Sequence, residues 1–303
     1  MTESAIQLKN VHKYYGNLHA LRGVDLEVEK GEVFGFLGPN GAGKTTTIRC
    51  MLDLIRPNQG SILIFGSDPQ RHPQTVKSKV GYLPGDLSIE GDFTARDFLK
   101  HIRRLRRNLR PWDDLLLMAE RLELSLDRKV KALSQGNKQK VGLIQSFASE
   151  VPMLLLDEPS MRLEPLIKQE VLNIIREESE KGTTVFFSSH ILSEVQQVAD
   201  RVGIIRKGRL VEIANTDDLI TRSITRATIQ FMDAVPESSF DDLSNIKVLR
   251  INNDHQSYTL EVEGEMDGFI KKLAEFPVRE LSIHRPSLEE IFLKYYKDDG
   301  KKD

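Results

Sequence analysis

The hydrophobic positions at the start of the chain alternate first with the period of a strand and then with that of a helix. Residues 5–37 are typical of strands, because apolar and polar residues alternate over Val24–Val28 and the apolar run VFGFLG follows at 33–38. Such a run is usually buried on both faces, as in a parallel α/β sheet. Helical spacing then begins in TTTIRCMLDLI at 45–55, and we expect that helix to end before Pro57.

The same two periods continue along the chain. The expected strands are SILIFGS (61–67), VGYLP (80–84), MLLLD (153–157), TTVFFSSH (183–190) and a hairpin in VGIIRKGRLVEIA (202–214). The expected helices are TARDFLKHIRRLRR (94–107), DDLLLMAERLEL (113–124), one that begins near Asn137, LIKQEVLNIIREESEKG (166–182) and ILSEVQQVAD (191–200). This order predicts an α/β core that is interrupted by a helical subdomain at about 86–150.

After about residue 220 the pattern restarts. The expected strands here are RATIQFMD (226–233), IKVLRINN (246–253), SYTLEVEG (257–264) and VRELSIH (278–284), and the expected helices are MDGFIKKLAEF (266–276) and SLEEIFLKYY (287–296). About 80 residues are enough for a small separate domain. We therefore expect one domain at 1–219 and a second, α+β domain at 220–303.

Composition narrows the class of protein. The 303 residues carry 43 Lys and Arg against 45 Asp and Glu, so the formal net charge of −2 offers no global attraction to nucleic acid. Cys50 is the only cysteine in the sequence, which favours a reducing compartment. The first residues, MTESAIQLKN, do not resemble a signal peptide, and no run approaches the roughly 20 apolar residues that cross a bilayer. We expect a chain that does not itself span a membrane.

The segment GPNGAGKTT (38–46) fits the phosphate-loop pattern G-x-x-x-x-G-K-[ST]. Glycines let the backbone N–H groups of such a loop converge on phosphates, at the positive end of the following helix. Lys44 is expected to reach the β- and γ-phosphates, and the Thr45 hydroxyl to bind Mg²⁺. The residues expected to contact the nucleotide are Gly38, Pro39, Asn40, Gly41, Ala42, Gly43, Lys44, Thr45 and Thr46. The pattern predicts a nucleoside-triphosphate site.

A second candidate element is MLLLDEPS, in which an apolar strand ends in Asp157 and Glu158. The carboxyl end of such a strand is where open α/β sheets bind ligands. Asp157 suits a Mg²⁺ position, and Glu158 suits the general base that polarises an attacking water. Adjacent strand residues point to opposite faces, so only a turn after the strand can bring both to one site. The alternative is a pair of acidic residues that opens a surface loop.

Between these elements, LSQGNKQKVGLIQSF (133–147) resembles the signature of the ATP-binding-cassette (ABC) family, usually LSGGQ, with Ser134 and Gly136 at matching positions. The resemblance covers about residues 5–218 and implies roles for further residues. His190 resembles the switch histidine that contacts the γ-phosphate and the attacking water, and Tyr15, with Tyr14 as the alternative, resembles the aromatic that stacks on adenine.

The resemblance implies the P-loop cassette fold, with a mixed sheet and an inserted helical subdomain. It also implies ATP hydrolysis with Mg²⁺, and a signature that serves ATP bound by a second ATP-binding subunit, identical or different. Transport would then need a separate membrane-spanning permease, with this chain peripheral at the cytoplasmic face of the cell membrane. KQKVGLIQ and PSLEEIFLKYY resemble the branch of type-two exporters, in which the C-terminal domain regulates or stabilises the dimer.

The chain departs from the family pattern at two places. Gly85 and Asp86 stand where a Gln usually follows GYLP, and Met161-Arg162-Leu163-Glu164 stands in place of S-G-L-D. Our hypothesis is that these changes alter coupling or dimer closure and leave the hydrolytic chemistry intact.

A basic run and two other functions remain to be weighed. KHIRRLRRNLR (100–110) carries six Lys or Arg, as a solvated helix face or as a contact with anionic lipid or acidic loops of a membrane partner. An ABC ATPase that acts on nucleic acid or ribosomes generally has two cassettes or a long coiled coil, which this sequence lacks. A soluble P-loop kinase would leave the signature and the histidine unexplained. The sequence therefore favours a transport ATPase without a nucleic-acid partner.

Overall fold

The computed structural model describes residues 4–216, 225–252 and 254–284, and it divides the chain into two compact units, Met1–Ala214 and Asn215–Asp303. The expected domain boundary at 219/220 and the expected helix at 287–296 lie outside the described residues. Among the described residues, no helix is both long and apolar enough to cross a membrane.

The first unit is built around a six-stranded sheet with strand order β5-β6-β7-β3-β8-β9. The strands are β3 (Val33–Leu37), β5 (Val80–Leu83), β6 (Met153–Asp157), β7 (Thr184–Ser189), β8 (Arg201–Arg206) and β9 (Arg209–Asn215). The pairs β5/β6, β6/β7, β7/β3 and β3/β8 are parallel, and every residue of β3, β6 and β7 is buried. The apolar runs of the sequence thus form the centre of the sheet, and their carboxyl ends meet at one edge.

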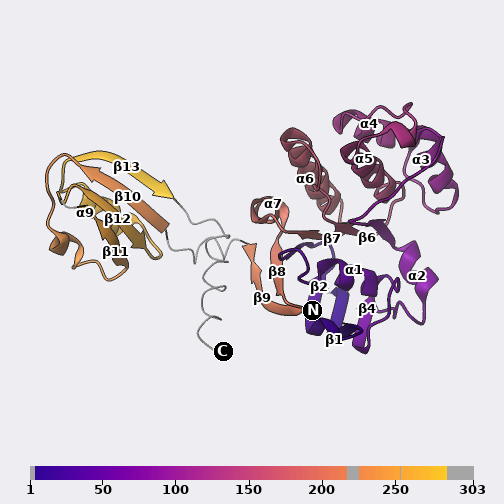
Figure 1. Ribbon diagram of the computed structural model, residues 1–303, viewed down its shortest axis with the longest axis horizontal. Helices are drawn as coiled ribbons and strands as arrows, with labels where there is room; N and C mark the ends of the chain where they lie inside the picture. Colours follow the sequence, from indigo (N-terminus) through magenta and orange to yellow (C-terminus); the bar gives the residue numbers. More distant parts are fainter. Residues whose placement is uncertain (1–3, 217–224, 253, 285–303) are drawn as a thin grey trace. The chain divides into compact units, whose positions relative to one another are not determined.

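A second, antiparallel sheet has the order β2-β1-β4, with β1 (Ser4–Tyr15), β2 (Leu18–Glu29) and β4 (Gln59–Ile64). Helix α1 (Lys44–Met51) contacts β2 and β4 of this sheet and β6 of the first, so it lies between the two sheets (Figure 1). α1 ends four residues before the expected limit of 55. Asp53 has a positive φ of 50°, and its backbone leaves the helix there.

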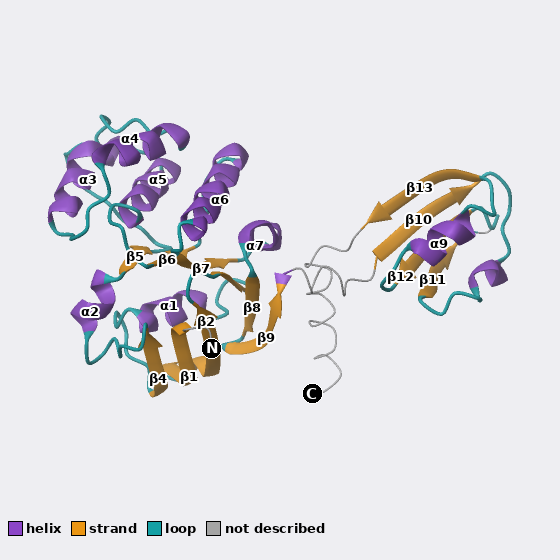
Figure 2. Ribbon diagram, turned by 180° about the vertical axis from the view of Figure 1, so that it is seen from behind, coloured by secondary structure: helices purple, strands orange, loops and turns teal. Residues whose placement is uncertain are grey.

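Apart from the short helix beside β5, the remaining helices of the first unit cover the other face of the large sheet or form a separate block (Figure 2). α6 (Pro165–Glu180) and α7 (Leu192–Val198) contact β3 and β7. The block, which we call the helical block, contains α3 (Ala95–Arg104), α4 (Trp112–Arg121), the 3₁₀ turn η1 (Val130–Ala132) and α5 (Gln135–Ser146). It matches the expected inserted helical segment.

Local capping explains where these helices begin. Thr94 and Asp97 form a reciprocal capping box at the start of α3. The Ser134 side chain caps α5, so this helix starts at Gln135 and not near Asn137. A short helix that the pattern did not predict, α2 (Pro73–Ser78), begins on a proline, which suits the first turn of a helix.

The second unit contains a four-stranded antiparallel sheet with order β11-β12-β10-β13. Its elements are β10 (Thr225–Phe231), the 3₁₀ turn η2 (Glu237–Phe240), β11 (Ile246–Ile251), β12 (Ser257–Val262), α9 (Asp267–Leu273) and β13 (Val278–His284). Phe231, Tyr258, Leu260 and Phe269 are among the side chains of its own hydrophobic core. Alternation along β10 and β12 buries every second residue, as the period of two predicts.

Candidate functional site

The phosphate loop follows β3 and leads directly into α1. Gly41 and Gly43 have φ values of 80° and 116°, a left-handed region that glycine enters without steric cost. A Cβ atom at Gly38 would lie 2.4 Å from the carbonyl oxygen of Ile205, so no larger residue fits there. These glycines let the loop turn tightly and present the N-terminus of α1 to the space above the sheet.

Lys44, the first residue of α1, is buried, with 6% of its surface exposed. Its Nζ donates to the Gly38 carbonyl at 2.5 Å and to the Pro39 carbonyl at 3.3 Å, and lies 3.0 Å from Glu158 Oε1. The ammonium group is therefore held by its own loop and by the acidic residue at the end of β6.

Asp157, the last residue of β6, and Glu158, which follows it, lie close together because the chain turns at Glu158. The φ of Glu158 is 52°, which is uncommon for a residue with a side chain. The hydroxyl of Ser188 donates to Asp157 Oδ1 at 2.6 Å and accepts the Glu158 backbone N–H at 2.9 Å. The turn that we expected after this strand is thus present at Glu158, and Ser188 on β7 stabilises it.

His190 follows the end of β7 directly. β7 stops at Ser189, one residue before the expected end, and the imidazole is partly exposed. Its Nδ1 lies 2.7 Å from Glu158 Oε2. Lys44, Glu158 and His190 come from three separate elements, yet the two oxygens of one carboxylate join them in a chain of contacts.

A cavity of about 640 Å³ opens beside Lys44 and Glu158, whereas Asp157 and His190 are not among the described residues that line it. Its lining includes Tyr15, His19, Arg22, Pro39, Asn40, Gly41, Gly43, Lys44, Thr45, Thr46, Arg49, Gly85, Asp86, Glu158 and Lys207. The volume suits a small-molecule ligand, and the four Lys and Arg side chains suit a polyphosphate. Two further residues of the loop, Gly38 and Ala42, are buried and are not among the described residues that line the cavity.

The tyrosine pair separates in the structure. Tyr15 lines the cavity and is 45% exposed, while Tyr14 stacks on His19 with ring centroids 4.0 Å apart. Lys13 Nζ lies 5.4 Å from the centroid of the Tyr15 ring. Of the two candidates, Tyr15 is the one placed to stack on a ligand in the cavity.

The signature residues lie at the start of α5. Ser134 Oγ accepts the backbone N–H of Asn137 at 3.2 Å, and a Cβ at Gly136 would lie 2.7 Å from the Arg162 carbonyl oxygen. In the described part of the chain, the cavity lining includes neither Ser134 nor Gly136. The structure therefore does not bring the signature to the cavity of the same chain.

One residue that the sequence reasoning missed links the signature helix to the acidic turn. The buried Gln139 Nε2 donates to the Glu158 carbonyl at 3.1 Å and to the Pro159 carbonyl at 3.4 Å. Its signal in the sequence is weak, because a polar residue on a helix gives no indication of a distant partner. The contact makes the position of α5 sensitive to the turn at Glu158.

The first departure from the family pattern also lies at the site. Gly85 and Asp86 line the cavity, and a Cβ at Gly85 would lie 2.9 Å from Asp157 Oδ2. A side chain at this position would displace the Asp157 carboxylate or the backbone of residue 85. The absence of a side chain at Gly85 therefore leaves room for the Asp157 carboxylate in its present position.

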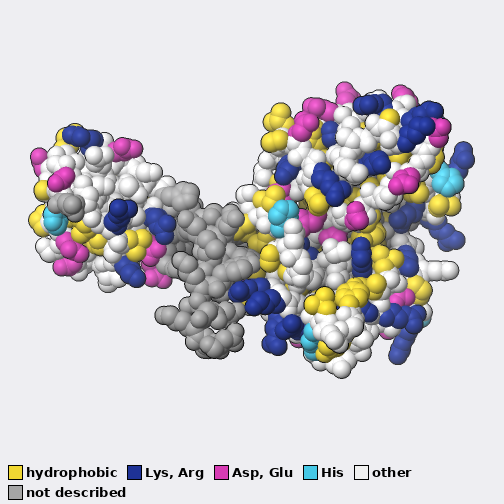
Figure 3. Space-filling view, viewed as in Figure 1, with side chains coloured by type: hydrophobic (Ala, Val, Ile, Leu, Met, Phe, Trp, Pro, Cys, Tyr) yellow, Lys and Arg dark blue, Asp and Glu magenta, His cyan; other side chains and the backbone are white. Residues whose placement is uncertain are grey.

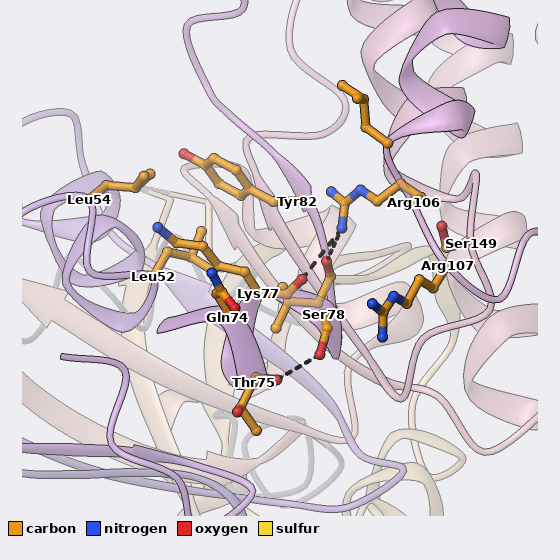
Figure 4. Close-up of a pocket in the computed structure, with 12 residues that line it drawn as sticks. Leu52, Leu54, Gln74, Thr75, Lys77, Ser78, Tyr82, Arg106, Arg107 and Ser149 are labelled. Carbon is orange, nitrogen blue, oxygen red and sulfur yellow. Dashed lines mark hydrogen bonds between the residues drawn. The ribbon is translucent and has the colours of Figure 1, made fainter. Parts of the chain in front are cut away.

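A second hollow, of about 700 Å³, lies between the core and the helical block (Figure 4). We call it the groove, and its lining includes Leu52, Leu54, Lys77, Tyr82, Leu105, Arg106 and Arg107. Leu105 is 71% and Leu54 50% exposed, while Arg106 Nη1 donates to the carbonyls of Lys77 and Val80 at the edge of the core. Figure 3 shows Lys and Arg side chains gathered where α2 and α3 lie.

The basic run 100–110 is therefore not a single solvated face. Arg106 and Arg107 line the groove, whereas Arg110 turns inward and forms two hydrogen bonds, 2.7 and 2.5 Å long, with the buried carboxylate of Glu178 on α6. Burial raises the pKa of Glu178, but the hydrogen bonds and the positive charges of Arg110 and Lys181 together hold the pKa below its usual value. This ion pair ties the helical block to α6.

Comparison with known proteins places these features in a family. Residues 21–161 match the family model described as "ABC transporter". The chain is 32% identical to the daunorubicin resistance ATP-binding protein DrrA3 of Streptomyces coeruleorubidus, over 99% of this chain and 98% of the relative. It is 34% identical to the bacitracin transport ATP-binding protein BcrA of Enterococcus faecalis, over 73% of this chain and 72% of that relative.

Solved structures of ATP-binding subunits and cassettes share the fold of this chain. One titled as the structure of the ATP-binding subunit of an ABC transporter matches 71% of this chain and 91% of its own, with a TM-score of 0.64 and 27% identity. A dimeric ATP-binding cassette, MJ0796, bound to ADP and Pi, matches 70% of this chain and 98% of its own with a TM-score of 0.62, and its 22% identity shows the fold alone.

Proposed function

The chain belongs to the ABC transporter family, and we propose that it hydrolyses ATP to drive export through a separate membrane-spanning subunit. Membership confirms the recognition made from the signature and the order of motifs, and with it the P-loop cassette fold and the ATPase activity. The direction of transport is inferred from relatives, whose names describe daunorubicin resistance, bacitracin transport and, in Paraburkholderia xenovorans at 28% identity, Nod factor export.

The observation that carries the proposal is the contact chain from Lys44 through Glu158 to His190. The Lys44 ammonium faces the Glu158 carboxylate, and a γ-phosphate bound beside the loop would offer the ammonium a more highly charged partner. Glu158 is then free to accept a proton from water. The imidazole of His190, 2.7 Å from Glu158, orients that carboxylate and the water between it and the phosphate.

The residues present fit Mg²⁺. Asp157 Oδ2 is buried and, among the described residues, has no hydrogen-bond partner, which is costly unless a cation or water satisfies it. Thr45 lines the cavity, as does Glu158, the residue that follows Asp157. Asp157 and Thr45 would hold the ion, and Mg²⁺ when bound would neutralise charge on the β- and γ-phosphates.

Two such chains would complete two sites. Ser134 and Gly136 lie outside the lining of their own chain's cavity, and Ser134 caps a helix whose N-terminus suits an anion. The signature of each chain would contact the ATP bound by the other, so that two ATP molecules lie between two cassettes, either identical or different. Closure on ATP and opening after hydrolysis would supply the mechanical step.

The groove supports the proposed membrane partner. It combines exposed leucines with Lys77, Arg106 and Arg107, so it suits an amphipathic segment that carries Asp or Glu beside its apolar residues. Because the groove joins the core to the helical block, a segment seated there would sense their relative movement. A membrane subunit bound there would hold the chain at the cytoplasmic face of the membrane. The alternative action on nucleic acid or ribosomes gains no support from the relatives' names.

Two experiments test the proposal, one with purified protein and one in cells. We expect the purified wild type to hydrolyse ATP, and we expect the Glu158→Gln variant to form a dimer on sizing chromatography when ATP is present. Persistent monomer at millimolar ATP would contradict the two-chain arrangement.

A photo-crosslinking amino acid at position 105 should capture an integral membrane protein in the native host, whereas the same amino acid at Leu117, 57% exposed on α4, should not. Equal capture at both positions would reject the groove as the docking surface.

A further inference from the structure

A buried carboxylate lies directly behind the proposed hydrolytic residues. Glu194, on α7, has only 6% of its surface exposed. Its Oε2 accepts hydrogen bonds from Ser160 Oγ at 2.7 Å and from Ser189 Oγ at 2.8 Å. The nearest cation recorded is Lys168, whose Nζ lies 3.9 Å from Oε1. A buried charge that is balanced so incompletely is costly, which calls for an explanation beyond packing.

The two serines belong to the two segments that carry Glu158 and His190. Ser160 lies two residues after Glu158, in a turn closed by the Met161 N–H donating to the Glu158 carbonyl at 3.1 Å. Ser189 immediately precedes His190. One oxygen of Glu194 therefore joins the segment of the proposed base to the segment of the proposed histidine.

Ser188, which precedes Ser189 on β7, fixes the start of the same turn. Consecutive strand residues face opposite sides, and Ser188 bonds both Asp157 and the backbone of Glu158 while Ser189 faces Glu194. The turn is thus fixed at its start by Ser188 and at its end by Glu194 through Ser160. Glu158 needs such support because its left-handed backbone is disfavoured for a residue with a side chain.

We propose that Glu194 is a positioning residue for ATP hydrolysis. Its carboxylate fixes the end of the Glu158 turn against the end of β7, so that the Glu158 carboxylate and the His190 imidazole keep their 2.7 Å contact. Hydrogen bonds to an ionised acceptor are stronger than neutral ones, which suits a joint that must persist while nucleotide enters and leaves. The inference rests on the proposed role of Glu158 as base.

The experiment compares Glu194→Ala with Glu194→Gln in the full chain. We expect Glu194→Ala to lower kcat at least tenfold and to leave the dissociation constant of a non-hydrolysable ATP analogue within twofold, because Glu194 does not line the nucleotide cavity. Glu194→Gln should recover kcat to within about threefold, because its amide oxygen can still accept both serine hydroxyls. Unchanged kcat in a folded Glu194→Ala protein, or equal losses in kcat and analogue binding, would overturn the proposal.

Ser160→Ala provides the second test, should Glu194→Ala fail to fold. It should lower kcat about threefold or more, and combined with Glu194→Gln the two effects should not multiply, because both act through one joint. Multiplying effects, or an unchanged kcat in Ser160→Ala, would reject the shared joint. The matched control is Ser146→Ala, which removes a buried hydroxyl bonded to the Leu143 carbonyl on α5 and should leave kcat unchanged.

The two levels of inference fail differently. If Glu158→Gln hydrolyses ATP as the wild type does, the assignment of the base is wrong and Glu194 loses its proposed role with it. If Glu158→Gln is inactive and Glu194→Ala is fully active, only the role of Glu194 is wrong.

Discussion

The nucleotide cavity and the groove occupy the same unit but are built from opposite materials. The cavity is backed by buried, mutually hydrogen-bonded polar groups, among them Asp157, Glu158 and Ser188. The groove exposes Leu54 and Leu105 beside arginines, and the described part of the chain leaves at least half of the surface of each leucine uncovered. Hydrolysis needs charges fixed before the substrate arrives, whereas docking needs apolar surface that a partner covers on binding. The difference fits the proposed roles, with hydrolysis at the cavity and docking of a partner at the groove.

The largest expected effect breaks the chemistry and spares the docking. Glu158→Gln should lower kcat by about a thousandfold, the order of magnitude for loss of a general base, while ATP still binds. Steady-state ATPase assays and equilibrium nucleotide binding measure the two properties. Glu180→Gln, at an exposed position of α6, is the control and should behave as the wild type.

The second prediction concerns the joint between the two regions. Arg110→Ala removes two charge-assisted hydrogen bonds from the buried Glu178 carboxylate and leaves it the ion pair with the exposed Lys181, so the free energy of unfolding of the first unit should fall by about 2 kcal/mol. Thermal or denaturant unfolding measures the change. Arg104→Ala, at an exposed position of α3, is the control; an equal loss there would contradict the importance of the pair.

The same pair predicts a pH dependence. Because the pKa of Glu178 is lower in the folded chain than in the unfolded one, its ion pair stabilises fully above the unfolded pKa. That contribution should be lost as the pH falls through the lowered, folded pKa. Unfolding curves of wild type and Arg110→Ala should therefore converge towards acidic pH, and a constant difference down to that range would contradict the assignment.

A smaller effect should follow at the edge of the cavity. Gly85→Ala places a Cβ 2.9 Å from Asp157 Oδ2, so the carboxylate must shift, and kcat should fall about tenfold, equivalent to roughly 1.4 kcal/mol. Binding of Mn²⁺ with ATP, followed by electron paramagnetic resonance, should weaken as well. Gly268→Ala, where a Cβ would meet only Leu243 Cδ2 at 3.6 Å, is the control.

The smallest effect on the isolated chain belongs to the groove. Leu105→Glu should leave basal ATPase activity within about twofold, because the site lies elsewhere, yet should reduce recovery of the chain with washed membranes several-fold. Leu117→Glu on α4 is the matched control. If both variants are recovered equally, the difference between cavity and groove loses its functional meaning.

The secondary structure and the position of the phosphate loop between β3 and α1 could largely be predicted, because their signals are local. Buried strands produce continuous apolar runs, and a phosphate loop needs its glycines and Lys44 at fixed spacing. Limits of helices shifted by a few residues where capping decided, as at Ser134, and α2 was missed because six residues carry too little periodicity. The charged run 100–110 read as one feature, although Arg110 and Arg106 have different partners.

By itself, the sequence determined the family, the α/β cassette and the phosphate-loop residues that we propose contact phosphate, since each depends on neighbours within a few positions. Only the tertiary structure decided which of Tyr14 and Tyr15 faces the cavity, why residue 85 is glycine, and that Gln139 and Glu194 support the turn at Glu158. Those contacts join residues that are far apart in the sequence: 19 positions separate Gln139 from Glu158, 34 separate Ser160 from Glu194, and 72 separate Gly85 from Asp157. Their energies depend on distance and burial in three dimensions, which no local pattern of residue types contains.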